Sequence, residues 1–267
     1  MQIYGPPAYH VGVSVRTTGQ GPNLVLIHGG SGSRTHWVNN VAVLAARFTV
    51  ITPDLPGFGE SASPSSDMST ADYLAWVAHA IHLAVNGQPF HLVGFSFGAT
   101  VSAGITPLLK ARGHAVSGLT LISPSGFGKP QGRTIKLEKI RKREDATLQE
   151  IREAAARNLG SWMLAKQPAA DDPVIDLHLR NVSLAKFDSR DISYEASLIK
   201  NLCGLALPMQ ILLGECDSLI FPSVEERKAL LNRSVPRAQV DIIAGAGHWL
   251  QYEASSAVNA KINQFHL

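Results

Sequence analysis

Short apolar runs rich in branched side chains recur along the chain, with glycine- and proline-containing turns between them. They cover residues 23–29, 48–57, 90–96, 119–126, 209–217 and 239–248. Most of these runs are nearly continuous rather than alternating, which is typical of strands that are buried on both faces of a parallel sheet. The pattern therefore predicts strands of a mostly parallel central sheet.

Helical periodicity lies between several of these runs. Residues 69–85 begin with Ser69 and Asp72 at capping-box spacing, and apolar positions then recur at helical intervals. Residues 99–113 and the C-terminal residues 253–267 also read as helices. Strands that alternate with helices predict an α/β fold, in which helices flank the central sheet.

The alternation breaks after the fourth predicted strand. In the segment that follows, Thr147 and Glu150 have capping-box spacing, and Gly160 stands where a glycine can end the helix. We interpret this segment as a mainly helical lid over the active site. The predicted division is a core made of residues 1–125 and 207–267, with a lid made of residues 126–206.

Composition limits the class of protein. Hydrophobic residues make up 45% of the 267 residues and charged residues 17%, which is ordinary for a globular protein. The net charge of +3 is too small to indicate a nucleic-acid partner. No apolar run approaches the roughly 18 residues that span a bilayer, and the N-terminus lacks a secretory pattern. Cys203 and Cys216 form no disulfide or metal framework, so we expect a cytoplasmic protein without a membrane partner.

The motif "GFSFG", residues 94–98, follows an apolar run and precedes a helical stretch. A strand, a very tight turn and a helix in this order make a nucleophile elbow, with Ser96 exposed at its tip. Glycine on both sides gives the backbone segments room to approach closely. A serine hydroxyl is a weak nucleophile at neutral pH and needs a histidine base that a carboxylate orients.

Asp217 and His248 are the candidates for the other two roles. Asp217 follows a buried strand in "ILLGECD", and His248 follows the last strand in "IIAGAGHWLQYE". The chain order serine, aspartate, histidine is the order expected of this elbow fold. His79 and His82 are one helical turn apart, but no third ligand accompanies them, so neither a metal site nor a cofactor is expected.

An oxyanion that forms during attack on a carbonyl needs preorganised N–H donors. We assign one donor to the backbone N–H of Phe97, directly after the nucleophile, and the other to Gly30 in "LIHGGSGS". The alternative, a phosphate-binding loop, fits poorly because the stretch lacks the lysine and the glycine spacing of such loops. His28 is interpreted as a residue that braces this loop.

The chain resembles the α/β-hydrolase superfamily over nearly its whole length. The resemblance rests on "HGG", "DLPGFGES", "GFSFG", "LLGECD" and "GHW". Within that superfamily, "HGGSGSRTHWVNN", "HWLQYE" and "DPVIDLHLRNVS" look most like the meta-cleavage-product hydrolases, which cleave a carbon–carbon bond in vinylogous diketo acids.

This resemblance implies that Arg180 binds the carboxylate end of the substrate, with Arg190 as the alternative, because a guanidinium binds carboxylate bidentately. The chain departs from that family at Phe95 and Phe97, where asparagine and methionine are more common. Both changes make the elbow more apolar, which an ester hydrolase tolerates. Four residues complete the predicted substrate pocket: Trp37, Asn39, Phe95 and Trp249.

The basic run at residues 129–143 has two interpretations. It holds seven lysines and arginines and a single glutamate, Glu138. Such a run can steer anionic substrates toward a site, but it is more often the solvated face of a helix, which is the interpretation we favour.

Together these features predict a cofactor-independent serine hydrolase that acts on a small-molecule carbonyl substrate. The expected reaction is carbon–carbon cleavage of a vinylogous diketo acid, and carboxylic ester hydrolysis is the alternative. A ligand sensor built on a hydrolase scaffold is the second alternative. No nucleic-acid partner is expected, and a homodimer is left open.

Overall fold

The computed structural model describes residues 4–129, 137–139 and 146–267. An eight-stranded sheet forms its centre, with strand order β1-β2-β4-β3-β5-β6-β7-β8. The pairs β1·β2 and β2·β4 are antiparallel and all other neighbours are parallel. The strands are β1 (Pro7–His10), β2 (Val13–Thr18), β3 (Asn23–Ile27), β4 (Thr49–Pro53), β5 (Phe90–Phe95), β6 (Val116–Ile122), β7 (Met209–Gly214) and β8 (Ala238–Ile243).

The six predicted strands correspond to β3–β8, and the predicted mostly parallel α/β sheet is confirmed. The sequence pattern missed β1 and β2. β1 is short and largely exposed, and β2 is buried only along its first half, so neither has the apolar run of a central strand. These two strands form the antiparallel edge that doubly wound sheets often carry.

Helices cover both faces of the sheet. They are η1 (Arg34–Trp37), α1 (Val41–Leu44), α2 (Thr70–Val85), α3 (Phe97–Ala111), α4 (Leu148–Trp162), α5 (Pro173–Leu184), α6 (Arg190–Ser193), α7 (Leu198–Cys203), α8 (Val224–Ser234), α9 (Leu250–Glu253) and α10 (Ser255–His266). None of the helices within the described residues is long and apolar enough to cross a membrane.

Successive residues of each central strand belong to two separate hydrophobic clusters, one on each face of the sheet. Val25 and Leu92 pack with the apolar sides of α2, α3, α7 and α8. Leu24 and Val93, their direct neighbours in sequence, pack with α1, α9 and α10 on the other face. Because both faces are covered, successive residues of the central strands are all buried, which explains their continuous apolar runs.

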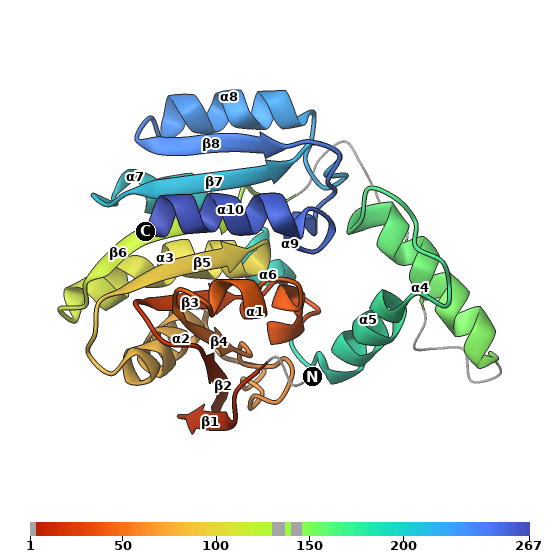
Figure 1. Ribbon diagram of the computed structural model, residues 1–267, viewed down its shortest axis with the longest axis horizontal. Coiled ribbons are helices and arrows are strands. Elements are labelled where there is room, and N and C mark those ends of the chain that lie inside the picture. Colours follow the sequence, from red (N-terminus) through yellow and green to blue (C-terminus); the bar gives the residue numbers. More distant parts are fainter. Residues whose placement is uncertain (1–3, 130–136, 140–145) are drawn as a thin grey trace.

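Between β6 and β7 the chain forms α4, α5, α6 and α7. Figure 1 shows α4 and α5 at the side of the molecule, beyond the carboxyl ends of the parallel strands. The two later helices pack against α3, and Leu198 and Leu202 of α7 belong to the cluster on that face. The segment 126–206 therefore has an outlying part, α4 and α5, and a part that is packed onto the core.

Helix α4 begins as the sequence predicts but continues further. Thr147 and Glu150 form the full capping box, yet the prediction that Gly160 ends the helix is wrong, because α4 extends to Trp162. A Cβ atom on Gly160 would lie 2.6 Å from Cβ and 2.7 Å from Cα of Gln167. Glycine is needed here for close approach of the chain, not for helix termination.

Most of the basic run 129–143 lies outside the described residues. Within the part that is described, Glu138 forms an ion pair with Arg157 of α4, with Oε1 and Nε 2.5 Å apart. The carbonyl of Glu138 also accepts a hydrogen bond from Asn158 at 3.0 Å. These contacts attach the described part of the run to α4.

Candidate active site

Ser96 occupies a strained turn between β5 and α3. Its backbone has φ 53° and ψ −116°, a conformation that L-residues rarely adopt. The strand ends at Phe95 and the helix begins at Phe97, so Ser96 alone makes the turn. Its N–H donates to the carbonyl of Ile122 at 2.9 Å, which fixes the turn to β6.

The two glycines of "GFSFG" are required by close contacts. A Cβ atom on Gly94 would lie 2.5 Å from the carbonyl oxygen of Gly98 and 2.4 Å from Oγ of Ser102. A Cβ atom on Gly98 would lie 2.3 Å from the carbonyl oxygen of His28. Side chains at either position would push the strand, the turn and the neighbouring loop apart. This geometry is that of a nucleophile elbow.

Ser96, His248 and Asp217 form one hydrogen-bonded chain. Nε2 of His248 lies 2.9 Å from Oγ of Ser96, and Nδ1 of His248 lies 2.8 Å from Oδ2 of Asp217. The other carboxylate oxygen of Asp217 accepts the N–H of Leu219 at 2.9 Å. The three side chains come from the loops that follow β5, β7 and β8, whose carboxyl ends lie at the same edge of the sheet.

The environment keeps Asp217 ionised. Burial by itself would raise the pKa of this carboxyl, but the charge of His248 and the hydrogen bonds from His248 and Leu219 hold the pKa below its ordinary value. An ionised Asp217 accepts from Nδ1–H of His248 and leaves Nε2 free to accept a proton.

Gly30 lies beside the elbow, as the predicted oxyanion hole requires. A Cβ atom on Gly30 would lie 3.7 Å from Cβ of Phe97 and 2.4 Å from Oγ of Ser189. Neither the Gly30 N–H nor the Phe97 N–H donates a hydrogen bond to another group of the described residues. Both amides are thus available to a ligand atom next to Ser96.

Two buried histidines brace the glycine loop. Nε2 of His28 accepts the N–H of Leu55 at 2.8 Å, and Nδ1 of His28 lies 2.7 Å from the carbonyl oxygen of Gly29. Nδ1 of His36 accepts the Gly29 N–H at 3.2 Å. Burial lowers the pKa of both rings, that of His36 well below its ordinary value, so both are neutral braces.

Of the residues predicted to bind substrate, Trp37 and Trp249 are buried in the core and Asn39 is exposed. Trp37 is fully buried in the cluster around α1 and α10. The buried Trp249 donates from Nε1 to the carbonyl of His36 at 2.9 Å. Nδ2 of Asn39 donates to the carbonyl of Tyr252 at 3.1 Å, which links the turn after η1 to α9. Large aromatics close to an active-site loop are as useful for holding that loop as for touching a ligand.

Phe95 supports the candidate base. Its ring is fully buried and lies 5.2 Å from the His248 ring and 5.2 Å from the His36 ring, measured between centroids. Phe97 faces the other side, toward Phe58 at 6.1 Å and Phe187 at 6.4 Å. The elbow is therefore flanked by aromatic rings on both sides.

Both candidate arginines are exposed. Arg180 is exposed, whereas the buried face of α5 carries Ile175, His178 and Asn181. Arg190 is also exposed and forms an ion pair with Asp188, with Nε 2.8 Å from Oδ1. The helical phase of α5 explains the exposure of Arg180. Arg180 lies two positions from the buried His178, so it points to another side of the helix.

The buried face of α5 contains site residues that the sequence reasoning missed. Oδ1 of Asn181 accepts the hydroxyl of Ser33 at 2.7 Å and that of Thr35 at 2.9 Å, which docks α5 onto the glycine loop. His178, one turn away, is buried, and burial lowers its pKa to about 4. The spacing of Ile175, His178 and Asn181 at i, i+3 and i+6 was the available signal.

His79 and His82, the histidine pair predicted from the sequence, both lie on α2. His82 contacts His114 through Nδ1 and Nε2, and the His79 ring centroid lies 6.2 Å from that of His82. Among the described residues, no group of three or more histidine, cysteine, aspartate or glutamate side chains is arranged to bind a metal ion.

Residues 24–261 match the model of the alpha/beta hydrolase family. The chain belongs to this family. The match runs from within β3 to within α10 and therefore contains every residue of the elbow, the histidine loop and the aspartate loop.

Curated relatives of this hydrolase have several activities. It is 29% identical over 258 residues to the dihydrolipoyllysine-residue acetyltransferase component of the acetoin cleaving system of Pseudomonas putida, covering 92% of this chain but only 63% of that protein. It is 28% identical to the pimeloyl-[acyl-carrier protein] methyl ester esterase of Aeromonas salmonicida, covering 88% of this chain and 92% of the esterase. The chain thus spans less than two thirds of the first relative but nearly the whole length of the second.

Solved structures agree on the fold. The esterase RhEst1 from Rhodococcus sp. superposes with a TM-score of 0.72 at 23% identity, covering 95% of this chain and 94% of the esterase. A meta-cleavage product hydrolase from Pseudomonas fluorescens has a TM-score of 0.72 at 21% identity and covers 100% and 98% of the two chains. The hydrolase fold and the resemblance expected from the motifs are both confirmed.

Proposed function

We propose that this protein is a serine hydrolase that cleaves carboxylic esters with apolar acyl or alcohol groups. The observation that carries the proposal is the hydrogen-bonded chain from Ser96 through His248 to Asp217, at 2.9 and 2.8 Å. Distances of this kind let a histidine remove the serine proton while the hydroxyl oxygen attacks a carbonyl carbon.

The reaction proceeds through an acyl-enzyme. Ser96 Oγ attacks the ester carbonyl, Nε2 of His248 takes the hydroxyl proton, and the N–H groups of Gly30 and Phe97 stabilise the oxyanion. Collapse of the tetrahedral intermediate breaks the ester C–O bond, and His248 returns the proton to the departing alkoxide. A water molecule activated by His248 then attacks the acyl-enzyme, which releases the carboxylic acid and restores Ser96.

Asp217 has an orienting role in both halves of the reaction. It holds Nδ1–H of His248 and stabilises the imidazolium that forms when Nε2 accepts a proton. Its depressed pKa supports this role, because the carboxylate stays ionised at neutral pH.

The surroundings of Ser96 favour an ester over a diketo acid. The ring of Phe97 lies among Phe58, Tyr73 and Phe187, with centroid distances of 6.0–6.4 Å. These rings make the surroundings of the elbow apolar, which suits a neutral ester better than a carboxylate. A diketo acid needs a cation for its carboxylate, and Arg180, the residue that the resemblance implies for this purpose, is exposed on α5.

Carbon–carbon cleavage is the second candidate. It is supported by "HGGSGSRTHWVNN" and "HWLQYE", and by the full-length overlap with a meta-cleavage product hydrolase. In that reaction the dienol must first ketonise, so that the departing carbon leaves as a stabilised carbanion.

Initial rates on matched substrates test the proposal. p-Nitrophenyl acetate and butyrate are compared with a 2-hydroxy-6-oxo-dienoic acid, and Ser96→Ala serves as the control. We expect turnover of the esters by the wild type and its loss in Ser96→Ala. Faster turnover of the dienoic acid would favour the second candidate, and a fully active Ser96→Ala protein would overturn the serine mechanism. A wild type that turns over neither substrate but binds a ligand would favour a sensor.

A further inference from the structure

Both loops that carry the candidate base and its carboxylate are attached to one short segment of the α4–α7 insertion. This segment, residues 161–165, comprises the last two residues of α4 and the three residues after it; we call it the α4 end. Ser161, Met163 and Ala165 provide its polar contacts to the core.

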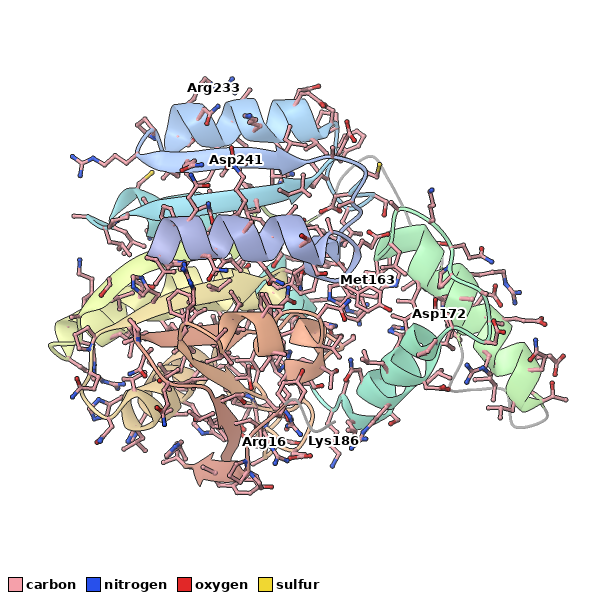
Figure 2. All side chains as sticks on the ribbon, viewed as in Figure 1. Arg16, Met163, Asp172, Lys186, Arg233 and Asp241 are labelled. Carbon is pink, nitrogen blue, oxygen red and sulfur yellow. The ribbon has the colours of Figure 1, made fainter. Side chains whose placement is uncertain are left out.

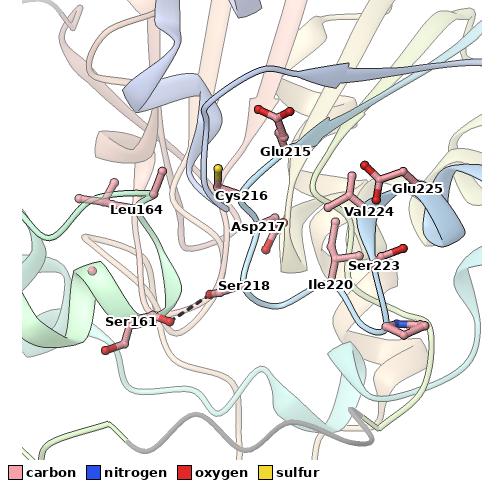
Figure 3. A pocket seen from close by; sticks show the side chains of 13 residues that line it. Ser161, Leu164, Glu215, Cys216, Asp217, Ser218, Ile220, Ser223, Val224 and Glu225 are labelled. Carbon is pink, nitrogen blue, oxygen red and sulfur yellow. Dashed lines mark hydrogen bonds between the residues drawn. The ribbon is translucent and has the colours of Figure 1, made fainter.

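Two of these contacts involve the direct neighbours of Asp217 and His248. The hydroxyl of Ser218 donates to the carbonyl of Ser161 at 3.0 Å, which is the dashed bond in Figure 3. The N–H of Trp249 donates to the carbonyl of Met163 at 2.7 Å. Figure 2 shows Met163 where α4 approaches α9.

The third contact is a carboxylate bridge made by Glu253 at the end of α9. Its Oε1 accepts the N–H of Ala165 at 2.8 Å, and its Oε2 accepts the N–H of Gly247 at 2.7 Å. Gly247 directly precedes His248, so one side chain joins the α4 end to the histidine loop. Hydrogen bonds to an ionised acceptor are stronger than those between neutral groups.

The backbones on the two sides of the bridge are in close approach. A Cβ atom on Gly247 would lie 2.5 Å from the backbone nitrogen of Ala165. The α4 end and the residue before His248 are therefore in direct backbone contact.

The α4 end also has space beside it. A cavity of about 670 Å³ is lined by Gly160, Ser161, Leu164 and Ala165 on one side and by the loop after β7 and the start of α8 on the other. Figure 3 shows Leu164 on one wall and Cys216 and Asp217 opposite. Glu253 itself is exposed, so water can compete for its carboxylate and the bridge can open without unfolding of the core.

We propose that Glu253 is a positioning residue that couples the α4 end to His248. With both N–H groups on its carboxylate, the histidine loop keeps the imidazole within reach of Ser96 and Asp217; release of the α4 end loosens that loop. The inference rests on the proposed serine-hydrolase function and adds a lid contact that controls alignment of the base. Misplacement of a catalytic group by about 1 Å can cost about 100-fold in rate.

Glu253→Gln is the informative variant, because an amide offers one acceptor oxygen while its NH₂ group meets the second N–H donor. Glu215→Gln is the matched control. The carboxylate of Glu215 accepts the N–H of Gly245 on the same loop at 2.7 Å, but this bond joins the β7 and β8 loops and not the α4 end.

Two measurements are made on the full-length variants. The first is amide hydrogen exchange in residues 163–167 and 245–249. The second is kcat and KM for p-nitrophenyl butyrate per active site, with sites titrated by an alkylphosphonate that labels Ser96. For Glu253→Gln we expect faster exchange in both segments, kcat lower by about tenfold and KM within twofold. For Glu215→Gln we expect faster exchange in 245–249 only.

Three results would overturn the inference. Unchanged exchange in 163–167 in Glu253→Gln would mean that the bridge does not hold the α4 end. Faster exchange with kcat per titrated site within twofold of the wild type would leave Glu253 a purely structural role. A wild type that neither hydrolyses the ester nor reacts with the phosphonate would remove the proposed function and this role together, which distinguishes it from failure of the Glu253 variant alone.

Discussion

The nucleophile elbow and the junction at the α4 end both depend on close backbone contacts, but those contacts join residues at very different separations. Gly94 meets Gly98 and Ser102 within the same strand–turn–helix unit, and only Gly98 also meets a distant segment, the loop at His28. The junction joins Ser161 to Ser218 and Ala165 to Glu253, which are 57 and 88 residues apart. A motif of five residues can therefore reveal the elbow, whereas no local pattern reveals the junction.

The elbow and the junction at the α4 end also differ in rigidity. The elbow is enclosed by β5, β6 and the loop at His28, so a Cβ atom added at Gly94 or Gly98 meets backbone within 2.5 Å. The junction consists of a few polar bonds beside a cavity, with an exposed carboxylate at its centre. We expect chemistry to depend steeply on the elbow and the triad, and more gradually on the insertion.

Among the variants, Asp217→Asn is expected to lower the catalytic rate most. The amide cannot stabilise the imidazolium and favours the wrong tautomer of His248, so kcat should fall by about 10⁴-fold with the fold retained. Ester hydrolysis and circular dichroism check this expectation. Asp241→Asn is the control, because Asp241 pairs with Lys261 on β8 and α10; equal losses in both variants would remove Asp217 from the mechanism.

Gly98→Ala should have the second-largest effect, on both stability and activity. Its new Cβ would lie 2.3 Å from the carbonyl oxygen of His28, so the glycine loop or the elbow must shift. We expect a loss of about 1–3 kcal/mol in the free energy of unfolding, typical of overpacking, and a loss of activity of about 100-fold. Denaturant unfolding and initial rates measure the two effects. Gly204→Ala, which meets only Asn201 at 3.7 Å, should show neither.

Acid should destabilise the fold at the end of the sheet remote from the elbow. His266 contacts His91 and Thr120, each at 2.9 Å, and burial lowers its pKa to about 3. Between pH 6.5 and about 3 the unfolded chain therefore binds more protons at this residue, so stability is full above pH 6.5 and falls as the pH is lowered. The loss should reach a few kcal/mol by pH 4.

Denaturant midpoints between pH 7 and pH 4 test this prediction, with His266→Gln as the variant. Glutamine can donate and accept hydrogen bonds but does not titrate, so the pH dependence should become shallower. A variant with the same slope as the wild type would assign the acid sensitivity to other groups, such as His178, whose pKa is about 4.

The smallest effect, a change in the free energy of unfolding, is expected from Gly160→Ala. Alanine is the better helix former by about 1 kcal/mol, but its Cβ would meet Gln167 at 2.6 Å. We expect the contact to outweigh the propensity, with a net loss of about 1 kcal/mol. Thermal unfolding compares it with Ser161→Ala at the next position, which should be nearly neutral. A stabilised Gly160→Ala protein would show that the α4 end adapts easily.

Much of the fold could be predicted because burial on both faces leaves a strong signal. The six central strands, α2, α3, the start of α4 and α10 all follow from apolar runs, periodicity or capping residues. The edge strands β1 and β2 lack such runs, and α8 is mostly polar with Val224 and Leu231 as its buried positions. Weak amphipathicity hides an element that packs by only a few residues.

The candidate site divides in the same way. Ser96, Asp217, His248, Gly30 and Phe97 were predicted from strand–loop context, and the structure places them around one point. The pocket residues were predicted less well. Trp37 and Trp249 are large aromatics near the right loops, but whether they face a ligand or the core depends on packing from distant segments.

The sequence alone indicated the six central strands, the elbow and three candidate side chains, because burial periodicity and turn chemistry are local and each candidate directly follows a predicted strand. Only the tertiary structure decided that α5 presents His178 and Asn181 rather than Arg180, and that Glu253 joins the α4 end to the histidine loop. The physical reason is that helical phase and long-range hydrogen bonds are set by how remote elements pack, which no local pattern records.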